Sequence, residues 1–149
     1  MSKADWCCSG NDGNGLWYTS NYSEEDWIQG LKTLVTRYNK TKNVVGVDLR
    51  NELRQTVVNG KRLSPTWGNE HNTTDRHATA ERCAKELLAV NSNLLMFIEG
   101  LDYASDLTGV VHHQVQLSAT NRVVYNVYDY SWFHQGHSYK EFKSEINKR

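Results

Sequence analysis

The sequence predicts an α/β fold in which about three parallel strands alternate with flanking helices after an N-terminal loop. Three short segments, 44–49, 94–98 and 123–127, are rich in Val, Ile and Leu. Such compact apolar runs are typical of strands buried on both faces of a parallel sheet. Segments with helical periodicity lie between and around these runs. Because this alternation requires crossover connections, we expect parallel strands joined by right-handed crossovers.

The first helix is expected to begin after Ser23 and to end near Asn39. Ser23 and Asp26 have the spacing of a capping box, and acidic residues occupy the first turn, where the helix dipole favours them. An apolar stripe at intervals of four, three, one and three residues comprises Trp27, Leu31, Leu34, Val35 and Tyr38.

A second helix is expected from about Asp75 to Asn91, with one buried face formed by Ala80, Cys83, Ala84, Leu87 and Leu88. Residues 54–73, which precede it, are interpreted as a polar loop containing the only proline. Residues 102–109 suggest a short helical turn. Ser138 and Glu141 should cap a last helix that carries Tyr139, Phe142 and Ile146 on one side.

Composition indicates one domain over residues 1–149, with a loop at 1–22 and α/β units at 23–149. Lys plus Arg and Asp plus Glu both number 17, so no net field attracts nucleic acid or an anionic membrane. No apolar run approaches the ~20 residues of a membrane span. No apolar stretch follows the first three residues, so we expect no signal peptide in this chain.

Metal and cofactor motifs are absent from the sequence. The six His are scattered without the spacing of a zinc site, and no glycine-rich nucleotide loop or serine-hydrolase motif occurs. Asp12 lies in a glycine-rich stretch, but one carboxylate is too few for a calcium loop. Of the three cysteines, Cys7 or Cys8 could pair with Cys83 or with a residue outside the chain. We therefore expect no metal and no cofactor.

Carboxylates, an amide and aromatic rings follow the predicted strands. In parallel α/β folds, functional sites form where the strands end. The residues at these ends are Asn51 and Glu52 after the first strand, Glu99, Asp102 and Tyr103 after the second, and Tyr128, Asp129, Tyr130 and Trp132 after the third. Two carboxylates with stacking rings suit a sugar site, because retaining glycoside hydrolysis uses two carboxyl groups about 5–5.5 Å apart.

Structural interpretations compete with this one. A Glu after a strand is often solvated or caps a helix, and Glu99-Gly100 is an ordinary way to begin a turn. The rings after the third strand could simply pack the loop layer.

Several segments, taken in order, resemble glycoside hydrolase family 5, the cellulases. The segment from Leu49 to Leu53, Leu-Arg-Asn-Glu-Leu, is similar to the Arg-Asn-Glu segment at the end of the family's fourth strand. Residues 6–15 resemble the loop after its third strand, residues 98–103 the end of its fifth, and residues 127–132 the end of its sixth. The resemblance thus covers roughly the third-to-sixth strand region of a (β/α)8 TIM barrel.

The resemblance implies a glycosidase that acts on β-glucan or cellulose-like O-glycosidic bonds with retention. Glu52 would be the acid/base and Asn51 would bind the sugar 2-hydroxyl. Tyr128, Tyr130, Trp132 and Glu99 are the further substrate-binding candidates. The partner implied is an oligo- or polysaccharide, and the location implied is extracellular.

The sequence departs from the family pattern at three places. The sixth strand usually ends His-x-Tyr, whereas this chain has Tyr128-Asp129-Tyr130. The family's nucleophile, a Glu after the seventh strand, would lie beyond Arg149, and a substrate-binding His and Arg would lie before Met1. Three strands cannot close a barrel, so we expect a fragment, a compact remodelled unit, or a homo-oligomer that covers the open sheet edges.

Two other functions stay open. A non-catalytic carbohydrate-binding or interaction protein could keep this scaffold without the second carboxylate, and Tyr128 in place of His favours that alternative. An unrelated small α/β domain of flavodoxin-like outline is weaker, because no phosphate-binding loop is present.

Overall fold

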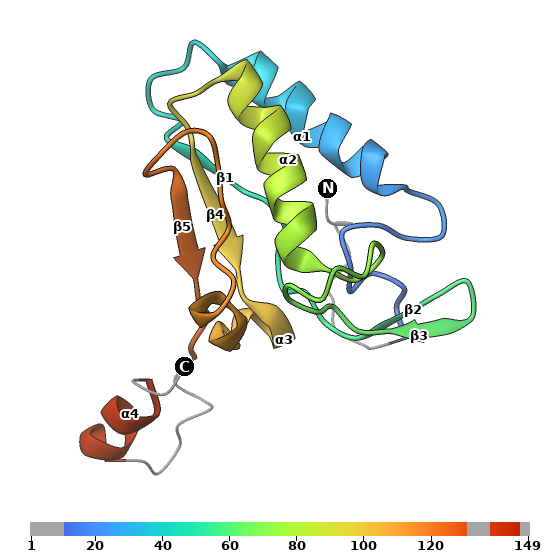
Figure 1. The fold of residues 1–149 in the computed structure, drawn as a ribbon, viewed down its shortest axis with the longest axis vertical. Coiled ribbons are helices and arrows are strands. Elements are labelled where there is room, and N and C mark those ends of the chain that lie inside the picture. Colours follow the sequence, from blue (N-terminus) through green and yellow to red (C-terminus); the bar gives the residue numbers. More distant parts are fainter. Residues whose placement is uncertain (1–10, 131–137, 147–149) are drawn as a thin grey trace.

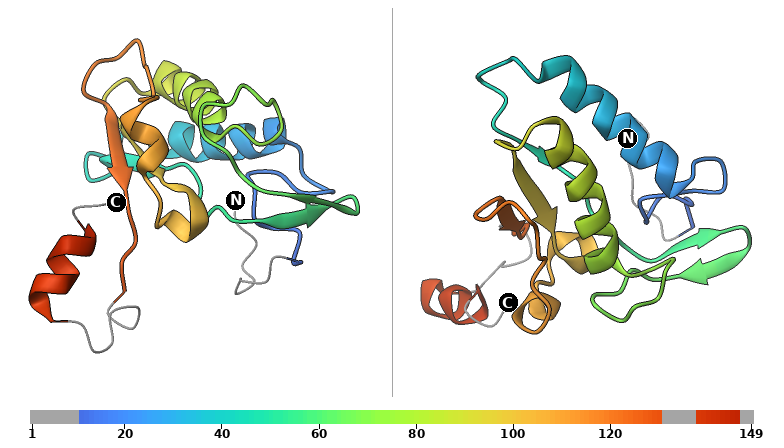
Figure 2. Two further views of the ribbon diagram at one scale, coloured as in Figure 1. Left: turned by 60° about the horizontal axis from the view of Figure 1, so that its bottom comes forward. Right: turned by 45° about the horizontal axis from the view of Figure 1, so that its top comes forward.

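The computed structural model describes residues 11–130 and 138–146. Within them, α1 (Glu24–Tyr38) is followed by β1 (Gly46–Asp48), and a hairpin of β2 (Thr56–Val58) and β3 (Lys61–Leu63) precedes α2 (Arg76–Val90). Next come β4 (Leu95–Glu99), α3 (Leu101–Ala104), the 3-10 turn η1 (Thr108–Val111) and β5 (Val123–Asn126). A last helix, α4 (Tyr139–Ile146), lies apart from the sheet (Figures 1 and 2).

The three predicted strands form one parallel sheet in the order β1-β4-β5. β4 and β5 run in the same direction, so their carboxyl ends meet beside α3 (Figure 1). The predicted α/β class and parallel sheet are therefore confirmed, and the sheet is open rather than a closed barrel.

The prediction that residues 44–49 form a strand buried on both faces is wrong in extent and in burial. β1 covers only three residues, and Val45 is 64% exposed. β1 lies at the edge of the described sheet, where it pairs with β4 alone, so the residues before it have no neighbouring strand to cover them. β4 is the central strand, and its Met96 and Ile98 are fully buried.

Both long helices begin where predicted, and the predicted capping box of the first helix is confirmed. Ser23 and Asp26 form a capping box at α1, and the carboxylate of Asp75 accepts from two amides of α2. All five residues of the predicted face of α2 are buried. The predicted stripe of α1 is only partly correct: Trp27, Leu31 and Val35 are buried, but Leu34 and Tyr38 are exposed. The core side of α1 instead includes Ile28.

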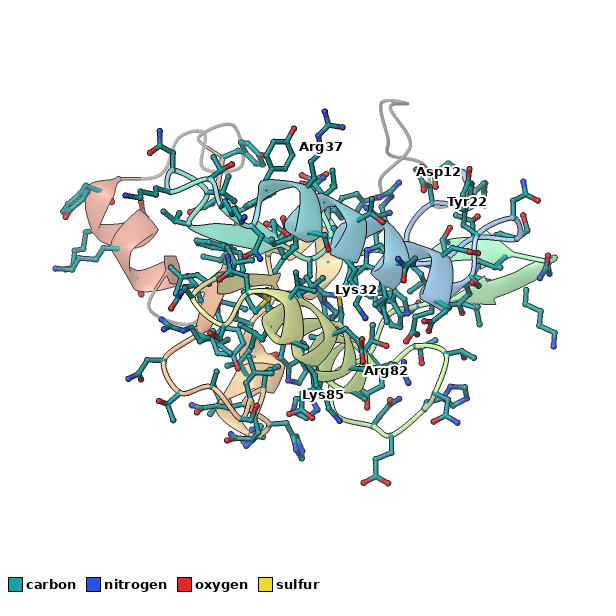
Figure 3. All side chains as sticks on the ribbon, turned by 90° about the horizontal axis from the view of Figure 1, so that it is seen from above. Asp12, Tyr22, Lys32, Arg37, Arg82 and Lys85 are labelled. Carbon is teal, nitrogen blue, oxygen red and sulfur yellow. The ribbon has the colours of Figure 1, made fainter. Side chains whose placement is uncertain are left out.

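The two helices pack against each other beside the sheet, as Figures 2 and 3 show. Lys32 of α1 forms an ion pair with Glu86 of α2 over 2.6 Å, and Arg82 of α2 forms one with Glu24 of α1. The labelled Lys32 lies toward α2 in Figure 3. These pairs tie the outer surfaces of the helices together, above a shared apolar core that contains Leu31, Val35, Ala84 and Leu87.

Residues 54–73 are not only the polar loop that was predicted, because they contain the β2–β3 hairpin. Its turn is Asn59-Gly60, both with positive φ, which is the geometry of a two-residue hairpin turn. The Asn-Gly pair after Thr-Val-Val was a readable hairpin signal that our prediction did not use.

The remaining expectations fall near their predicted places. Residues 101–111 hold two short helical turns, and Ser138 and Glu141 exchange hydrogen bonds at the start of α4. Cys83 is fully buried and forms no disulfide with any described residue, while Cys7 and Cys8 lie outside the described residues. No described helix is long and apolar enough to cross a membrane.

Candidate active site

The Asn51-Glu52 turn begins three residues after the end of β1 and is anchored on both sides. Leu49 and Leu53 are almost completely buried, and Leu49 extends the β1–β4 ladder by donating its amide to the Phe97 carbonyl over 3.1 Å. Between these anchors Asn51 is exposed and Glu52 is half-buried. Glu52 has φ +47°, in the left-handed region that residues other than glycine seldom occupy. The chain therefore presents both predicted residues on one tight, strained turn.

Two arginines hold the carbonyl groups of this turn. Arg50 donates from Nη1 to the Asn51 carbonyl over 2.7 Å, and Arg54 donates from Nη1 to the Glu52 carbonyl over 3.1 Å. Both side chains are buried. Burial lowers the pKa of Arg50, and the charge of Arg54 adds to the effect.

The same arginines bind the N-terminal loop to the turn. Arg50 donates to the carbonyls of Leu16 (3.0 Å) and Asn14 (2.5 Å). Arg54 forms an ion pair with Asp12 over 2.6 Å. The predicted loop 1–22, where it is described, is thus a support for the site, and Asp12 serves as a partner for arginine. Neither Arg50 nor Arg54 was among the predicted site residues.

Glu99, the last residue of β4, faces the turn from the adjacent strand. Strand alternation places it on the side of Phe97, opposite the core residues Met96 and Ile98. Its Oε2 accepts the Glu52 amide over 2.6 Å, and the side chain is 0% exposed.

The environment of Glu99 favours its neutral form. Burial raises the pKa of Glu99 from 4.5 to about 7, the Tyr128 hydroxyl and the Glu52 amide oppose this rise, and the nearby Asp48 adds to it. Oε1 of Glu99 has no hydrogen bond of standard geometry to a described residue. Complete burial also leaves no surface on Glu99 for a sugar to contact, so direct substrate binding by this residue does not fit the geometry.

The loop after β4 joins the ends of all three strands. Asp102, Tyr103 and Ala104 all have positive φ, and the Tyr103 amide donates to the Leu53 carbonyl over 2.9 Å. The Tyr128 amide in turn donates to the Ala104 carbonyl over 2.9 Å. Gly100 is required at the start of this loop, because a Cβ there would lie 2.3 Å from the Asp106 carbonyl oxygen.

Tyr128 and Tyr130 follow β5 and border the turn. The Tyr128 hydroxyl donates to Oδ1 of Asn51 over 3.3 Å, and the two tyrosine rings meet edge to face with centroids 6.3 Å apart. Burial, together with the nearby Glu99, raises the pKa of Tyr128 well above its usual value, so the hydroxyl keeps its proton. Trp132, the other predicted ring, lies outside the described residues.

Arg76, which was not among the predicted site residues, lies beneath the site. Its side chain is fully buried at the first turn of α2, near the charges of Asp48 and Glu99. Burial lowers the pKa of Arg76 to about 10, so the group stays charged at neutral pH. Its guanidinium nitrogens make no hydrogen bond to a described residue. An Arg in the first turn of a helix, where the dipole disfavours cations, was the available signal.

The described residues contain no cluster of three or more His, Cys, Asp or Glu able to hold a metal. What the strand ends do bring together is one half-buried carboxyl (Glu52), one exposed amide (Asn51), one buried carboxyl (Glu99) and two tyrosines. Such a group can bind a polar ligand with several hydroxyls and can exchange a proton with it.

The comparisons with known proteins identify the family. Residues 5–149 match the model of the cellulases, glycosyl hydrolase family 5. The chain belongs to glycosyl hydrolase family 5. It is 37% identical over 126 residues to an endoglucanase of Paenibacillus polymyxa, covering 77% of this chain and 30% of that protein. It is 31% identical over 132 residues to a glycosyl hydrolase 5 family protein of Chamaecyparis obtusa, covering 89% of this chain and 21% of that protein.

Solved members of the family have the same arrangement of elements. The hyperthermophilic endocellulase of Pyrococcus horikoshii superposes with a TM-score of 0.72 at 27% identity, covering 90% of this chain and 41% of that chain. The catalytic domain of the major endoglucanase of Xanthomonas campestris superposes with a TM-score of 0.75 at 24% identity, covering 89% and 41%. The chain thus spans about two fifths of the solved structures, which agrees with the partial barrel that the sequence predicted.

Proposed function

We propose that this family 5 chain carries the acid/base part of a retaining glycosidase that acts on β-glucan or cellulose-like polysaccharide. The observation that carries the proposal is the Asn51-Glu52 turn, whose backbone groups are held by Arg50, Arg54 and Glu99. A carboxyl group fixed in this way can meet a glycosidic oxygen without reorganisation, which is the main advantage of a preorganised site.

Glu52 protonates the departing glycosidic oxygen and then, as a carboxylate, takes a proton from the water that releases the sugar. Asn51 contacts the sugar 2-hydroxyl, and Tyr128, Tyr130 and Trp132 supply faces and hydroxyls for the sugar ring. The nucleophile is a second Glu supplied from outside these residues. Secretion is part of the proposal, since one relative, 35% identical over 86 residues, is the major extracellular endoglucanase of Xanthomonas campestris.

Hydrolysis of a chromogenic cello-oligosaccharide tests the proposal. Glu52→Gln keeps the shape of the side chain and removes its titrating proton, so we expect the rate to fall by a factor on the order of 100 or more. Glu25→Gln, an exposed change in the first turn of α1, is the control and should leave the rate unchanged. Equal, measurable rates for wild type and Glu52→Gln would exclude Glu52 as the acid/base.

A non-catalytic sugar-binding protein is the alternative function, and Tyr128 in the position of the family's usual His favours it. Titration of the wild type and of Glu52→Gln with cellotetraose, followed by Trp fluorescence, separates the two functions. Saturable binding of cellotetraose to both proteins, with no hydrolysis by either, would support the alternative and exclude catalysis by this chain.

A further inference from the structure

Glu99 is a buried carboxyl group to which the proposed reaction assigns no step. Its complete burial keeps it from the sugar, yet it lies at a strand end rather than in the apolar core. An ionisable side chain in such a place is expensive unless a partner satisfies it. The Glu99 carboxyl therefore acts on the residues around it rather than on the sugar.

Glu99 forms a short hydrogen bond with the backbone of Glu52. The amide of Glu52 donates to Oε2 over 2.6 Å, which is short for an N–H···O bond and typical of a charge-assisted one. That amide belongs to a residue with φ +47°, a conformation that costs a non-glycine residue about 1 kcal/mol or more. The hydrogen bond offsets this strain at the residue whose carboxyl the reaction would use.

Tyr128 connects the same carboxyl to Asn51. Its hydroxyl donates to Oδ1 of Asn51 over 3.3 Å, and the same hydroxyl lowers the pKa of Glu99, so it is near both side chains. The backbone of Tyr128 is fixed by the Ala104 carbonyl. Glu99 therefore contacts Glu52 directly and reaches Asn51 through one ring.

We infer that Glu99 is a positioning residue, which holds Glu52 in its left-handed conformation through the Glu52 amide and orients Asn51 through Tyr128. Any effect of Glu99 on catalysis rests on the function proposed above, but the hydrogen bond between Glu99 and the Glu52 amide does not. Met, Leu or Ala at position 99 would leave the Glu52 amide without an acceptor, whereas Gln would still accept it.

The charges around Glu99 determine how this contact responds to pH. Asp48 faces it from the end of β1, Arg50 from the turn, Arg76 from α2, and Tyr128 from the segment after β5. Burial raises the pKa of Glu99 to about 7, although the Tyr128 hydroxyl and the Glu52 amide oppose the rise. Because a carboxylate accepts a hydrogen bond more strongly than a neutral carboxyl group, the bond to the Glu52 amide should strengthen as the pH rises through 7.

The amide proton of Glu52, observed by NMR in the full chain, tests the inference. We expect its resonance to lie downfield and to move further downfield between pH 5 and 9, with a midpoint near 7. In Glu99→Gln the downfield position should persist in part and the titration should vanish. In Tyr128→Phe the midpoint should move upward, because the hydroxyl that lowers the pKa of Glu99 is gone.

The backbone amide of Gln116 is a matched control, since it donates to a carboxylate oxygen of Glu81 over the same 2.6 Å. The resonance of this amide should be unchanged by Glu99→Gln. A Glu52 amide that does not titrate in the wild type, or that still titrates in Glu99→Gln, would overturn the inference.

Cellotetraose affinity supplies the functional readout. We expect Glu99→Met to weaken binding about tenfold and Glu99→Gln to restore most of it, because only Gln keeps an acceptor for the Glu52 amide. Equal weakening by both would show that charge rather than positioning matters, and would contradict the inference. If the wild type binds no cellotetraose, the proposed function fails, while the amide titration still decides the role of Glu99.

Discussion

Buried charge distinguishes the residues around this site from an ordinary strand end. Glu99 and Arg76 are both fully buried, and the charges of Asp48 and Arg50 lie near them. Removing an ion from water costs several kcal/mol even after relaxation, so such a group persists only where neighbours compensate it. In this chain the compensation fixes the backbone of the Asn51-Glu52 turn, and the free energy of unfolding should therefore depend on the protonation of Glu99.

The stability of the wild type relative to Glu99→Gln should fall as the pH rises from 5 to 8. The pKa of Glu99 is near 4.5 when the chain is unfolded and about 7 when it is folded, so between these values the folded state binds the additional proton. Stability from this group is complete below the lower value and is lost as the pH rises through the higher one, by roughly 3 kcal/mol at most. Urea unfolding of both proteins at several pH values measures the difference. A constant difference would contradict the burial that raises this pKa.

At the residue scale, the sequence predicts which residues lie together at the strand ends, but it does not predict which of them are buried. Asn51, Glu52 and Tyr128 were predictable as neighbours because each follows a parallel strand, and such ends share one edge. The burial of Glu99 was not predictable, because it depends on the loop 101–104 and on Tyr128 closing over it. Arg76 in the first turn of its helix was a local signal of something unusual, but that signal does not show that the helix start lies near the carboxyl groups of Asp48 and Glu99.

At the scale of the elements, capping residues and apolar periodicity predicted where the helices lie. The exposure of individual side chains depends on packing against distant parts of the chain. Ser23 caps its helix as predicted, and the second helix begins at Asp75 as predicted, because helix starts depend on residues only a few positions apart. The exposure of Leu34 and Val45 depends on what packs against them from distant parts of the chain, which periodicity does not contain. The hairpin at 56–63 was encoded locally, in Asn59-Gly60, and its turn should be sensitive to single substitutions.

Two glycines with open space around them should respond in opposite directions to alanine. Gly60 in the hairpin turn has φ +74° and Gly30 lies inside α1, and an added Cβ would meet no atom within 4 Å at either position. Gly60→Ala should destabilise the chain by about 1 kcal/mol through its left-handed conformation, whereas Gly30→Ala should stabilise it by about 0.5–1 kcal/mol. Thermal unfolding of both variants measures this. Shifts of the same sign would show that the conformation at these positions differs from the one described.

The whole molecule is an open parallel sheet with helices beside it, and it matches about two fifths of solved family 5 barrels. In the described residues β1 and β5 are both edge strands, each paired with β4 alone. Apolar side chains at these edges, Val44 and Val45 before β1 and Val127 after β5, are exposed. Unpaired backbone groups beside exposed apolar side chains form a template for pairing with another strand.

The chain should therefore associate in solution through the β1 edge. We expect sedimentation velocity to give a mass above that of the monomer, increasing with concentration. Val45→Lys places a charge at the edge and should shift the population toward monomer, because a lysine on an edge strand opposes strand pairing. Val111→Lys is the control: Val111 is 76% exposed in η1, outside the sheet, and its replacement should leave association unchanged. Equal effects of the two lysines would show that the β1 edge does not mediate association. A monomeric wild type at high concentration would show the same, and also that the open sheet is stable without a partner strand.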